Sequence, residues 1–489
     1  MWRRAVPLTT VAFAFVLLSA TAALAPPENQ DELLKGERHR LEQSRTLFRG
    51  GQKGGEARGI EVVGHHDIGG RGFNADVWAH EGFAYVGHWG FTDWAQGSKQ
   101  RFCPEEPDNG VAVIHYGTDP AHPVLVSRLQ NPPGTSAEDV VVFTARFGPM
   151  AGRDIAAVGI QVCGGSRLDP RFPRGLMLFD VTDPAHPIEL GFLDTGCCTR
   201  GVHEFEVQHR SDLGRIFAYA TVPASEYPEP TSPSGFRDGA GRGDFRLIDI
   251  TDPTNPFEVS DWGVVHDAGG PLNPGQGCDP DPIFGHGAEP SADGTEVFVA
   301  YWDSGFVALD LTDPTTPVLQ GHTVYEPDEE GNGHSSNFDD VRELLFAADE
   351  DFCPLAGPDI ERGLGYLRIF DYSDRANPVQ VGEFRTPDSV MMGTPASGDY
   401  TIHNPLLVGT KVYASWYSDG VRVIDVRDPR NPVETAFFVP PAGQNPVKPS
   451  QRFVLSQTPQ VWGVVYDEER DLILASDMNS GLWILRETG

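Results

Sequence analysis

The stretch GFVALDLTDPTTPV, from Gly305 to Val318, is the clearest of several related segments in this chain. It contains an apolar run with β-branched residues, an acidic turn bounded by prolines, and a further apolar residue. This order of residues predicts a strand, a tight turn and the start of a second strand. The same pattern recurs along the chain, and recurrence at a long, loose period indicates a repeat architecture.

The other copies of this segment differ from it mainly in length and in the residues of the turn. They read GLMLFDVTDPAHPI (175–188), FRLIDITDPTNPF (245–257), LRIFDYSDRANPV (367–379), VRVIDVRDPRNPV (421–433) and GVAVIHYGTDPAHPV (110–124). The last of these has one extra residue before its Asp-Pro pair. We expect the aspartates that end the apolar runs to cap the turns; they are Asp180, Asp249, Asp310, Asp371 and Asp425.

Residues 286–325, which surround the opening stretch, predict a unit of four strands. The expected strands are His286–Pro290, Glu296–Trp302, Phe306–Leu311 and Val318–Tyr325. Four antiparallel strands in about 40 residues are typical of one blade of a β-propeller. With insertions, the same plan fits residues 74–129, 135–193, 201–265, 333–386 and 401–439.

The last unit of the chain is incomplete, because residues 460–489 supply three strands and no Asp-Pro turn. The segment Gly59 to Ile68, near the other end of the chain, resembles the fourth strands of the complete units. If it paired with the C-terminal unit, two exposed sheet edges would be removed. We therefore predict an all-β fold, a seven-bladed β-propeller of four-stranded antiparallel blades that forms a single domain over residues 60–489.

The strand-turn segments LFDVTDP, LIDITDP and VIDVRDP resemble the LVIVD-repeat proteins, which are named for such segments. The resemblance covers roughly residues 60–489. It implies a propeller-like repeat fold, and it brings no catalytic residues with it.

The composition of the chain excludes some classes of partner. The net charge is −33, since 70 acidic residues oppose 37 basic ones. A surface this acidic argues against binding to nucleic acid, and against binding to anionic membranes by charge. Beyond the first 25 residues no run of ~18 apolar residues predicts a membrane span. The expected partner is an extracellular protein or a small ligand, and the expected state is a monomer.

Residues 1–25 are predicted to be a signal peptide. Arg3 and Arg4 precede an uncharged apolar run from Leu8 to Leu24, and small-residue cleavage sites end at Ala22 and Ala25. The arginine pair permits a twin-arginine export route as well as the general one. Residues 26–59 are expected to form a polar lead-in arm and linker. The mature protein is therefore expected to be secreted, either extracellular or in the cell envelope.

The six cysteines of this exported chain are expected to form disulfides. Six cysteines allow 15 pairings, among which the sequence does not choose. All six lie in or beside long loops, which we expect on the same face of the propeller as the starts of the first strands. Elaborated loops held on a rigid scaffold are typical of binding or catalytic surfaces.

The first strand of each propeller blade lines the central channel, and all first strands run in the same direction. Residues at their starts therefore converge at one end of the channel. Four consecutive units place a histidine there, with carboxylates beside it; the candidate metal-binding residues are His203, His286, His334, His403, Glu204 and Glu289. Neutral imidazoles suit iron, copper or zinc, and nearby carboxylates would orient the rings. Other propeller enzymes hold iron with one histidine from each of four blades, which is an architectural analogy.

Three interpretations of these histidines remain open at this point. They bind one transition metal, they form structural hydrogen bonds between blades, or they line a metal-free ligand site. The function that follows most directly from the repeats is a secreted binding scaffold, with its working face at the channel mouth. The alternative is a metal-dependent enzyme of the oxidoreductase type.

Overall fold

The computed structural model describes residues 55–92, 101–165, 169–196, 199–223, 225–226, 242–270, 272–273, 283–302, 304–325, 332–351, 364–390, 399–442 and 458–488. Within these ranges the chain is all-β, apart from one 3-10 helix, η1 (Ile68–Gly70). The expected signal peptide and nearly all of the expected lead-in arm lie outside the described residues. No helix in the described part of the chain is long and apolar enough to cross a membrane.

Antiparallel units of four strands follow one another along the chain, and in each unit consecutive strands pair. The first two units are β3 (Asn74–His80), β4 (Phe83–His88), β7 (Val111–His115) and β8 (Val124–Leu129), and then β9 (Thr135–Thr144), β10 (Asp154–Val162), β11 (Gly175–Asp180) and β12 (Ile188–Asp194). The single pairing of His88 with Ala137 joins these two units into one sheet. A short separate hairpin consists of β5 (Phe91–Thr92) and β6 (Arg101–Phe102).

The next three units repeat this arrangement as separate sheets. They are β13 (Phe205–Arg210), β14 (Arg215–Thr221), β15 (Phe245–Asp249) and β16 (Phe257–Trp262); β17 (Phe284–Pro290), β18 (Glu296–Trp302), β19 (Gly305–Asp310) and β20 (Val318–His322); and β21 (Gly333–Asp339), β22 (Leu344–Asp349), β23 (Leu367–Asp371) and β24 (Val379–Phe384). The strands predicted around the opening stretch agree with β17 to β20 to within a few residues.

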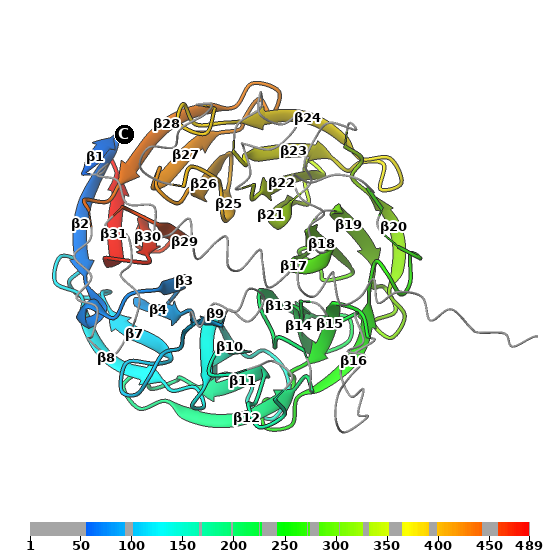
Figure 1. Ribbon diagram of the computed structural model, residues 1–489, viewed down its shortest axis with the longest axis horizontal. Helices are drawn as coiled ribbons and strands as arrows, with labels where there is room; N and C mark the ends of the chain where they lie inside the picture. Colours follow the sequence, from blue (N-terminus) through cyan, green and yellow to red (C-terminus); the bar gives the residue numbers. More distant parts are fainter. Residues whose placement is uncertain are drawn as a thin grey trace, which may run out of the picture.

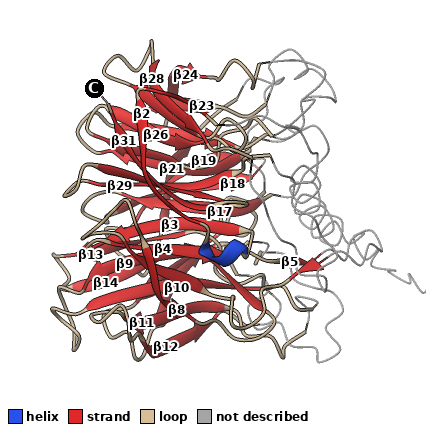
Figure 2. Cartoon of the chain, turned by 90° about the vertical axis from the view of Figure 1, so that its left-hand side faces the viewer, coloured by secondary structure: helices blue, strands red, loops and turns tan. Residues whose placement is uncertain are grey.

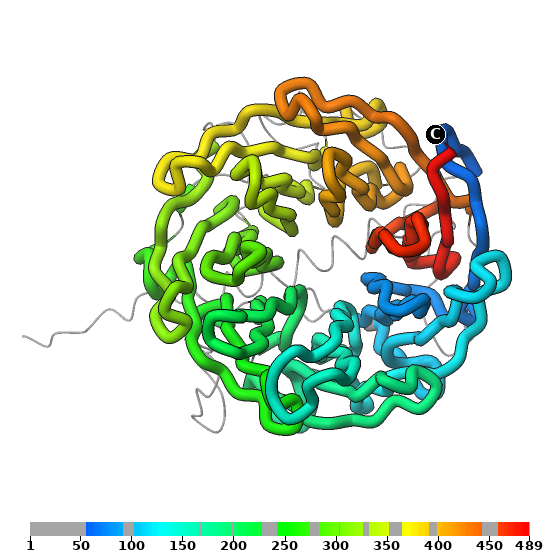
Figure 3. The backbone as a smooth tube through the Cα atoms, turned by 180° about the vertical axis from the view of Figure 1, so that it is seen from behind, coloured from blue at the N-terminus to red at the C-terminus, as the bar shows by residue number. Residues whose placement is uncertain are grey.

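The last two units include strands from the N-terminal side of the chain. One contains β25 (Pro405–Val408), β26 (Lys411–Ser415), β27 (Val421–Asp425) and β28 (Val433–Val439), with β1 (Glu56–Arg58) at its edge. The other contains β29 (Val461–Asp467), β30 (Leu472–Asp477), β31 (Gly481–Glu487) and β2 (Ile60–His66). β2 pairs antiparallel with β31, as expected for this N-terminal segment, and Figure 3 shows β2 (blue) beside β31 (red).

The units are arranged around a common centre, with their first strands innermost (Figure 1). Each first strand contacts the first strand of the next unit, and β29 contacts β3. The turned view shows strands running between two opposite faces, with β5 projecting from one of them (Figure 2). The first strands therefore surround the centre with their starts at one face.

The turn residues behave as their sequence predicts. Asp310 Oδ1 accepts a hydrogen bond from the backbone N–H of Thr312 at 2.7 Å. Asp180, Asp249, Asp371 and Asp425 each accept the equivalent bond from the residue two positions later. This local bond fixes the turn that follows the third strand of each of these units.

Each of these turns also packs against the fourth strand of the preceding unit. In β20, a Cβ atom at Gly321 would overlap the backbone carbonyl of Arg375, which belongs to the turn of the next unit. Gly191 and Gly382 are similarly close to the carbonyls of Pro253 and Pro429. Glycine is needed where the backbones of two neighbouring units come this close.

Serine occupies the same place in two other units. Ser127 Oγ in β8 donates to the Pro184 carbonyl at 2.5 Å, and Ser260 Oγ in β16 donates to the Pro314 carbonyl at 2.6 Å. The Asp-Pro turn of one unit is thus joined to its neighbour by close packing in some units and by a hydrogen bond in others.

The hydrophobic core lies between neighbouring units rather than inside any one of them. One cluster combines Tyr219 and Leu247 of the third unit with Val299 and Leu309 of the fourth, and clusters of the same kind lie at the other junctions. Because each sheet buries both faces against its neighbours, the inner strands are held in a fixed position around the centre.

Candidate metal centre

The four histidines singled out in the sequence lie at the starts of four consecutive inner strands. His286 is in β17 and His334 in β21, whereas His203 and His403 lie two residues before β13 and β25. None of the four residues is more than 3% exposed. The repeated architecture therefore brings together residues that are up to 200 positions apart in sequence.

The four imidazoles form a continuous row at the centre of the molecule. The ring centroids lie 4.2 Å apart for His203 and His286, 3.9 Å for His286 and His334, and 4.1 Å for His334 and His403. His203 Nε2 is 2.8 Å from His286 Nε2. Two histidines at most share any group of potential ligand atoms that lie within 4.8 Å of one another among the described residues, and His203 belongs to no such group.

A buried glutamate orients the first ring of the row. Glu138 Oε2 in β9 lies 2.8 Å from His203 Nδ1. Gln161 Nε2 in β10 donates to the same carboxylate oxygen and is 2.9 Å from His203 Nδ1. With Nδ1 engaged in this way, Nε2 of His203 faces the neighbouring histidine. A carboxylate on the far nitrogen of an imidazole is the usual outer partner of a metal ligand.

Two more glutamates lie beside the middle of the row. Glu204 Oε2 is 3.7 Å from His286 Nδ1, and Glu204 Oε1 is 3.7 Å from His334 Nε2. Glu350, directly after β22, places its Oε2 atom 3.5 Å from His334 Nε2. The Tyr417 hydroxyl donates a hydrogen bond to Glu350 Oε1. Carboxylates thus approach the row from two sides.

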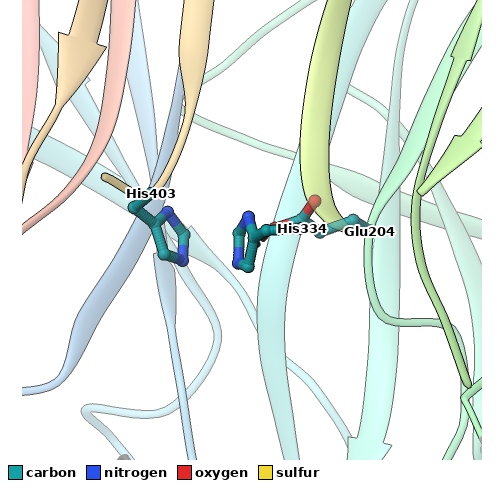
Figure 4. A group of neighbouring side chains, drawn as sticks. All are labelled: Glu204, His334 and His403. Atoms are coloured by element: carbon teal, nitrogen blue, oxygen red, sulfur yellow. Dashed lines mark ion pairs between the residues drawn. The ribbon is translucent and has the colours of Figure 1, made fainter. Parts of the chain in front are cut away.

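These side chains make two groups whose potential ligand atoms lie within 4.8 Å of one another. The groups are Glu204 with His334 and His403, and His286 with His334 and Glu350. Figure 4 shows the first of them, with the His334 ring between the His403 ring and the Glu204 carboxylate. His334 belongs to both groups and is the centre of the arrangement.

His403 lies at the aromatic end of the row. Its ring centroid is 4.3 Å from that of Trp462 and 5.3 Å from that of Tyr417. Burial, and then the charge of His203, lowers the pKa of His403 well below its ordinary value. The neutral imidazole favoured here is the form that binds metal ions.

Glu289, the remaining candidate from the sequence, lies away from the row. It is three residues beyond His286 along β17, where Oε1 accepts hydrogen bonds from Asn337 Nδ2 at 2.8 Å and from Phe338 N at 3.3 Å. It belongs to neither of the two groups of potential ligands. Metal binding by the other predicted residues stays a prediction.

Sequence reasoning missed Glu350 and Gln161. Both lie where a second strand ends, and in an antiparallel unit that end is beside the start of the first strand. A polar residue at the end of a predicted second strand, as in β22 and β10, is therefore the sequence signal that could have identified them.

A disulfide links two loops at the same end of the sheets. Cys103, just after β6, is bonded to Cys163, just after β10. The other four cysteines, Cys197, Cys198, Cys278 and Cys353, lie outside the described residues.

Comparison with protein families agrees with the repeats seen in the sheets. The LVIVD-repeat model matches residues 71–92, which contain β3 and β4, and residues 292–323, which contain β18, β19 and β20. These two matches are consistent with an LVIVD-repeat protein. No match was found among the curated proteins.

Proposed function

We propose that the units of this LVIVD-repeat protein close into one seven-bladed β-propeller over residues 60–489, and that the propeller holds a metal centre. The ring of contacts between first strands, including β29 with β3, supports closure. The pairing of β2 with β31 supports it as well, because it completes the last four-stranded unit from the N-terminal side.

The proposed centre is a single transition-metal ion bound by His203, His286, His334 and His403. The observation that carries this proposal is the buried row of four imidazoles, with Glu138, Glu204 and Glu350 beside their ring nitrogens. Structural hydrogen bonding between blades accounts less well for the row. His403 does interact with the backbone of Trp462 in the next unit, but that interaction leaves the approach of His203 Nε2 to His286 Nε2 unexplained.

The activity that fits this centre best is that of an oxidoreductase that uses iron. Four histidines would complete the tetrahedral shell of zinc, whereas a catalytic zinc keeps an open position. Iron can take six ligands, so four imidazoles would leave two coordination positions for reactants. Imidazole is also a suitable ligand for iron. When bound, the iron would supply the electron transfer. The protein would hold the imidazoles in place, orient them through the glutamates and exclude bulk water.

Metal analysis of the purified protein tests this proposal. We expect about one iron per chain, lost in His286→Ala and in His403→Ala. Glu138→Gln is expected to weaken binding about 10- to 100-fold, because it loosens the orientation of His203. His115→Ala, which changes a histidine in β7 outside the row, is the matched control and should keep the metal. Thermal unfolding of each variant checks that it folds.

A second candidate function is a secreted binding scaffold, favoured by the disulfide between Cys103 and Cys163. This disulfide links two loops at the face where the histidines lie. Loops that are held in place on a rigid scaffold are suited to recognising a partner. A chain that folds without metal, and that keeps its stability when His286 and His403 are replaced, supports this function and contradicts the metal centre. Export of the chain by residues 1–25 belongs to the same proposal.

A further inference from the structure

The channel directly beyond the histidine row contains a cavity of about 120 Å³. The residues that line this cavity belong to the inner strands or directly precede them. In the four units with a histidine, they are the three residues that follow that histidine in the sequence. After His203 the lining residues include Glu204 and Glu206, and after His286 they include Gly287 and Glu289. Side chains alternate along a strand, so residues at this spacing share the face that lines the channel.

Acidic side chains dominate the polar part of the cavity wall. The carboxylates are those of Asp76, Asp139, Glu204, Glu206 and Glu289, and no lysine or arginine is present among the described residues that line it. The hydrogen bonds that reach them come from neutral groups. Asn404 Nδ2 donates to Asp76 Oδ1 at 2.9 Å, and the Phe205 N–H donates to Asp139 Oδ2 at 2.9 Å.

Glu204 is the carboxylate at the boundary between the cavity and the histidine row. It is 7% exposed, and its Oε1 atom accepts no hydrogen bond from the described residues. A buried carboxylate oxygen without a donor is costly unless a ligand supplies one. This oxygen therefore indicates a ligand with positively charged or hydrogen-bond-donating atoms.

Burial also affects the acids farther from the histidines. Burial, followed by the charges of Glu289 and Asp139, raises the pKa of Glu206 well above its ordinary value. Burial raises the pKa of Glu289 to about 8. Both side chains therefore keep their protons to a higher pH than exposed glutamates do.

The spacing of the acids distinguishes between kinds of cation. Asp76, Asp139, Glu206 and Glu289 belong to no described group of three ligands with atoms within 4.8 Å of one another. A calcium ion needs several oxygens converging at about 2.4 Å from one point. The acids are therefore too dispersed to surround one such ion.

The apolar part of the wall suits an organic cation. Trp78, Leu406, Val464 and Val465 line the cavity together with the acids. An alkyl or aromatic group would pack against these side chains while an ammonium group lies among the carboxylates, and an indole ring such as that of Trp78 attracts cations.

We propose that this cavity binds a small organic ammonium ion and holds it beside the histidine row. The binding rests on the cavity alone. The further step, that the bound amine is the substrate, rests on the proposed function. In that case Glu204 is the residue that holds the amine next to the metal.

Isothermal titration calorimetry with butylammonium tests the proposal, on the full protein both as purified and after removal of metal by a chelator. We expect butylammonium to bind in both states, and butanol and butyrate, which have the same chain length, not to bind. Glu206→Gln and Glu289→Gln should each weaken binding at least 10-fold. Glu189→Gln, an exposed position on β12, is the matched control and should leave the affinity unchanged.

Other outcomes overturn the inference. Equal binding of butanol would mean an apolar pocket, and binding of calcium chloride without binding of butylammonium would mean an inorganic site. If the glutamine variants do not fold, Leu406→Ala tests the same cavity through its apolar wall, and unchanged butylammonium affinity in that variant contradicts the proposal. If the protein binds the amine but never contains iron, the ammonium site is supported and the proposed function is contradicted. If the protein contains iron but does not bind the amine, the proposed function is supported and the ammonium site is contradicted.

Discussion

Asp244 lies at the junction of the third and fourth units, where backbone N–H groups surround its carboxylate. It accepts hydrogen bonds from Ser225 at 2.6 Å, Glu226 at 3.1 Å and Gly285 at 2.8 Å. Its side chain is fully buried, and burial raises its pKa to about 7. Burial, and then the charge of Asp244, raises the pKa of Glu226 well above its ordinary value.

These pKa shifts predict how stability depends on pH. An aspartate in the unfolded chain loses its proton near pH 4, whereas folded Asp244 keeps it until about pH 7. The folded state therefore binds more protons over this window, and the contribution of Asp244 to stability is lost as the pH rises from about 4 to about 7. The slope is about 1 kcal/mol per pH unit for one group.

Asp244→Asn should therefore flatten the dependence of the urea midpoint on pH between pH 4 and pH 7. The variant is also expected to be less stable at pH 5, by about 1–3 kcal/mol, because an amide satisfies the three N–H donors less well. Asp313→Asn, at an exposed turn, is the control and should keep the wild-type slope. An unchanged slope in Asp244→Asn would show that another group dominates this pH range.

At the scale of one element, the fourth strand is defined by its contact with the turn of the next unit. β20 carries Gly321 against the Arg375 carbonyl, and its pairing with β19 shifts register between Ala308 and Leu309. The shift marks an irregularity that bends the strand at this contact. The fourth strand is the outer edge of its sheet, and this contact attaches it to the turn of the next unit.

Gly321→Ala should destabilise the protein by about 1–3 kcal/mol or more, because the added Cβ overlaps a backbone atom that cannot rotate away. Chemical unfolding monitored by tryptophan fluorescence measures this loss. Leu319→Ala on the same strand is the matched control, since Leu319 is exposed and should cost little. Equal stability of Gly321→Ala and the wild type would mean that the turn does not press on β20.

At the scale of the whole molecule, one contact of this type joins the two ends of the chain. Gly64 lies in β2, which pairs with β31, and a Cβ atom at Gly64 would overlap the Pro120 carbonyl in the turn of the first unit. The N-terminal strand is thus held on one side by the last unit and on the other by the first.

Gly64→Ala should lower the stability of the entire protein by about 1–3 kcal/mol, because it disturbs the junction between first and last units. We expect circular dichroism and tryptophan fluorescence still to report one unfolding transition, since every unit shares its core with its neighbours. Glu61→Ala, exposed on the same strand, is the control. Separate transitions for the two ends, or no loss of stability, would contradict closure of the ring through β2.

The repeat and its strands could be predicted from the sequence because their causes are local. Alternating apolar residues define the strands, and the Asp310 side chain reaches the N–H of Thr312 within its own turn. The meeting of His203, His286, His334 and His403 was also predictable, since equal positions in repeated units converge when the units surround one centre.

Only the tertiary structure decided which carboxylates accompany the histidines. Glu138 reaches His203 from the preceding unit, and Glu350 comes from the end of β22 to meet His334. Glu289, which the sequence analysis named as a candidate together with Glu204, instead accepts a hydrogen bond from Asn337 in β21 of the next unit. The contacts of Glu138 and Glu289 join different sheets, whereas Glu350 directly follows the strand that pairs with that of His334 in one sheet. All of them depend on how far the side chains reach once the units are packed together. The sequence by itself determined the repeating scaffold and the place of its histidines, because both follow from local pattern and register.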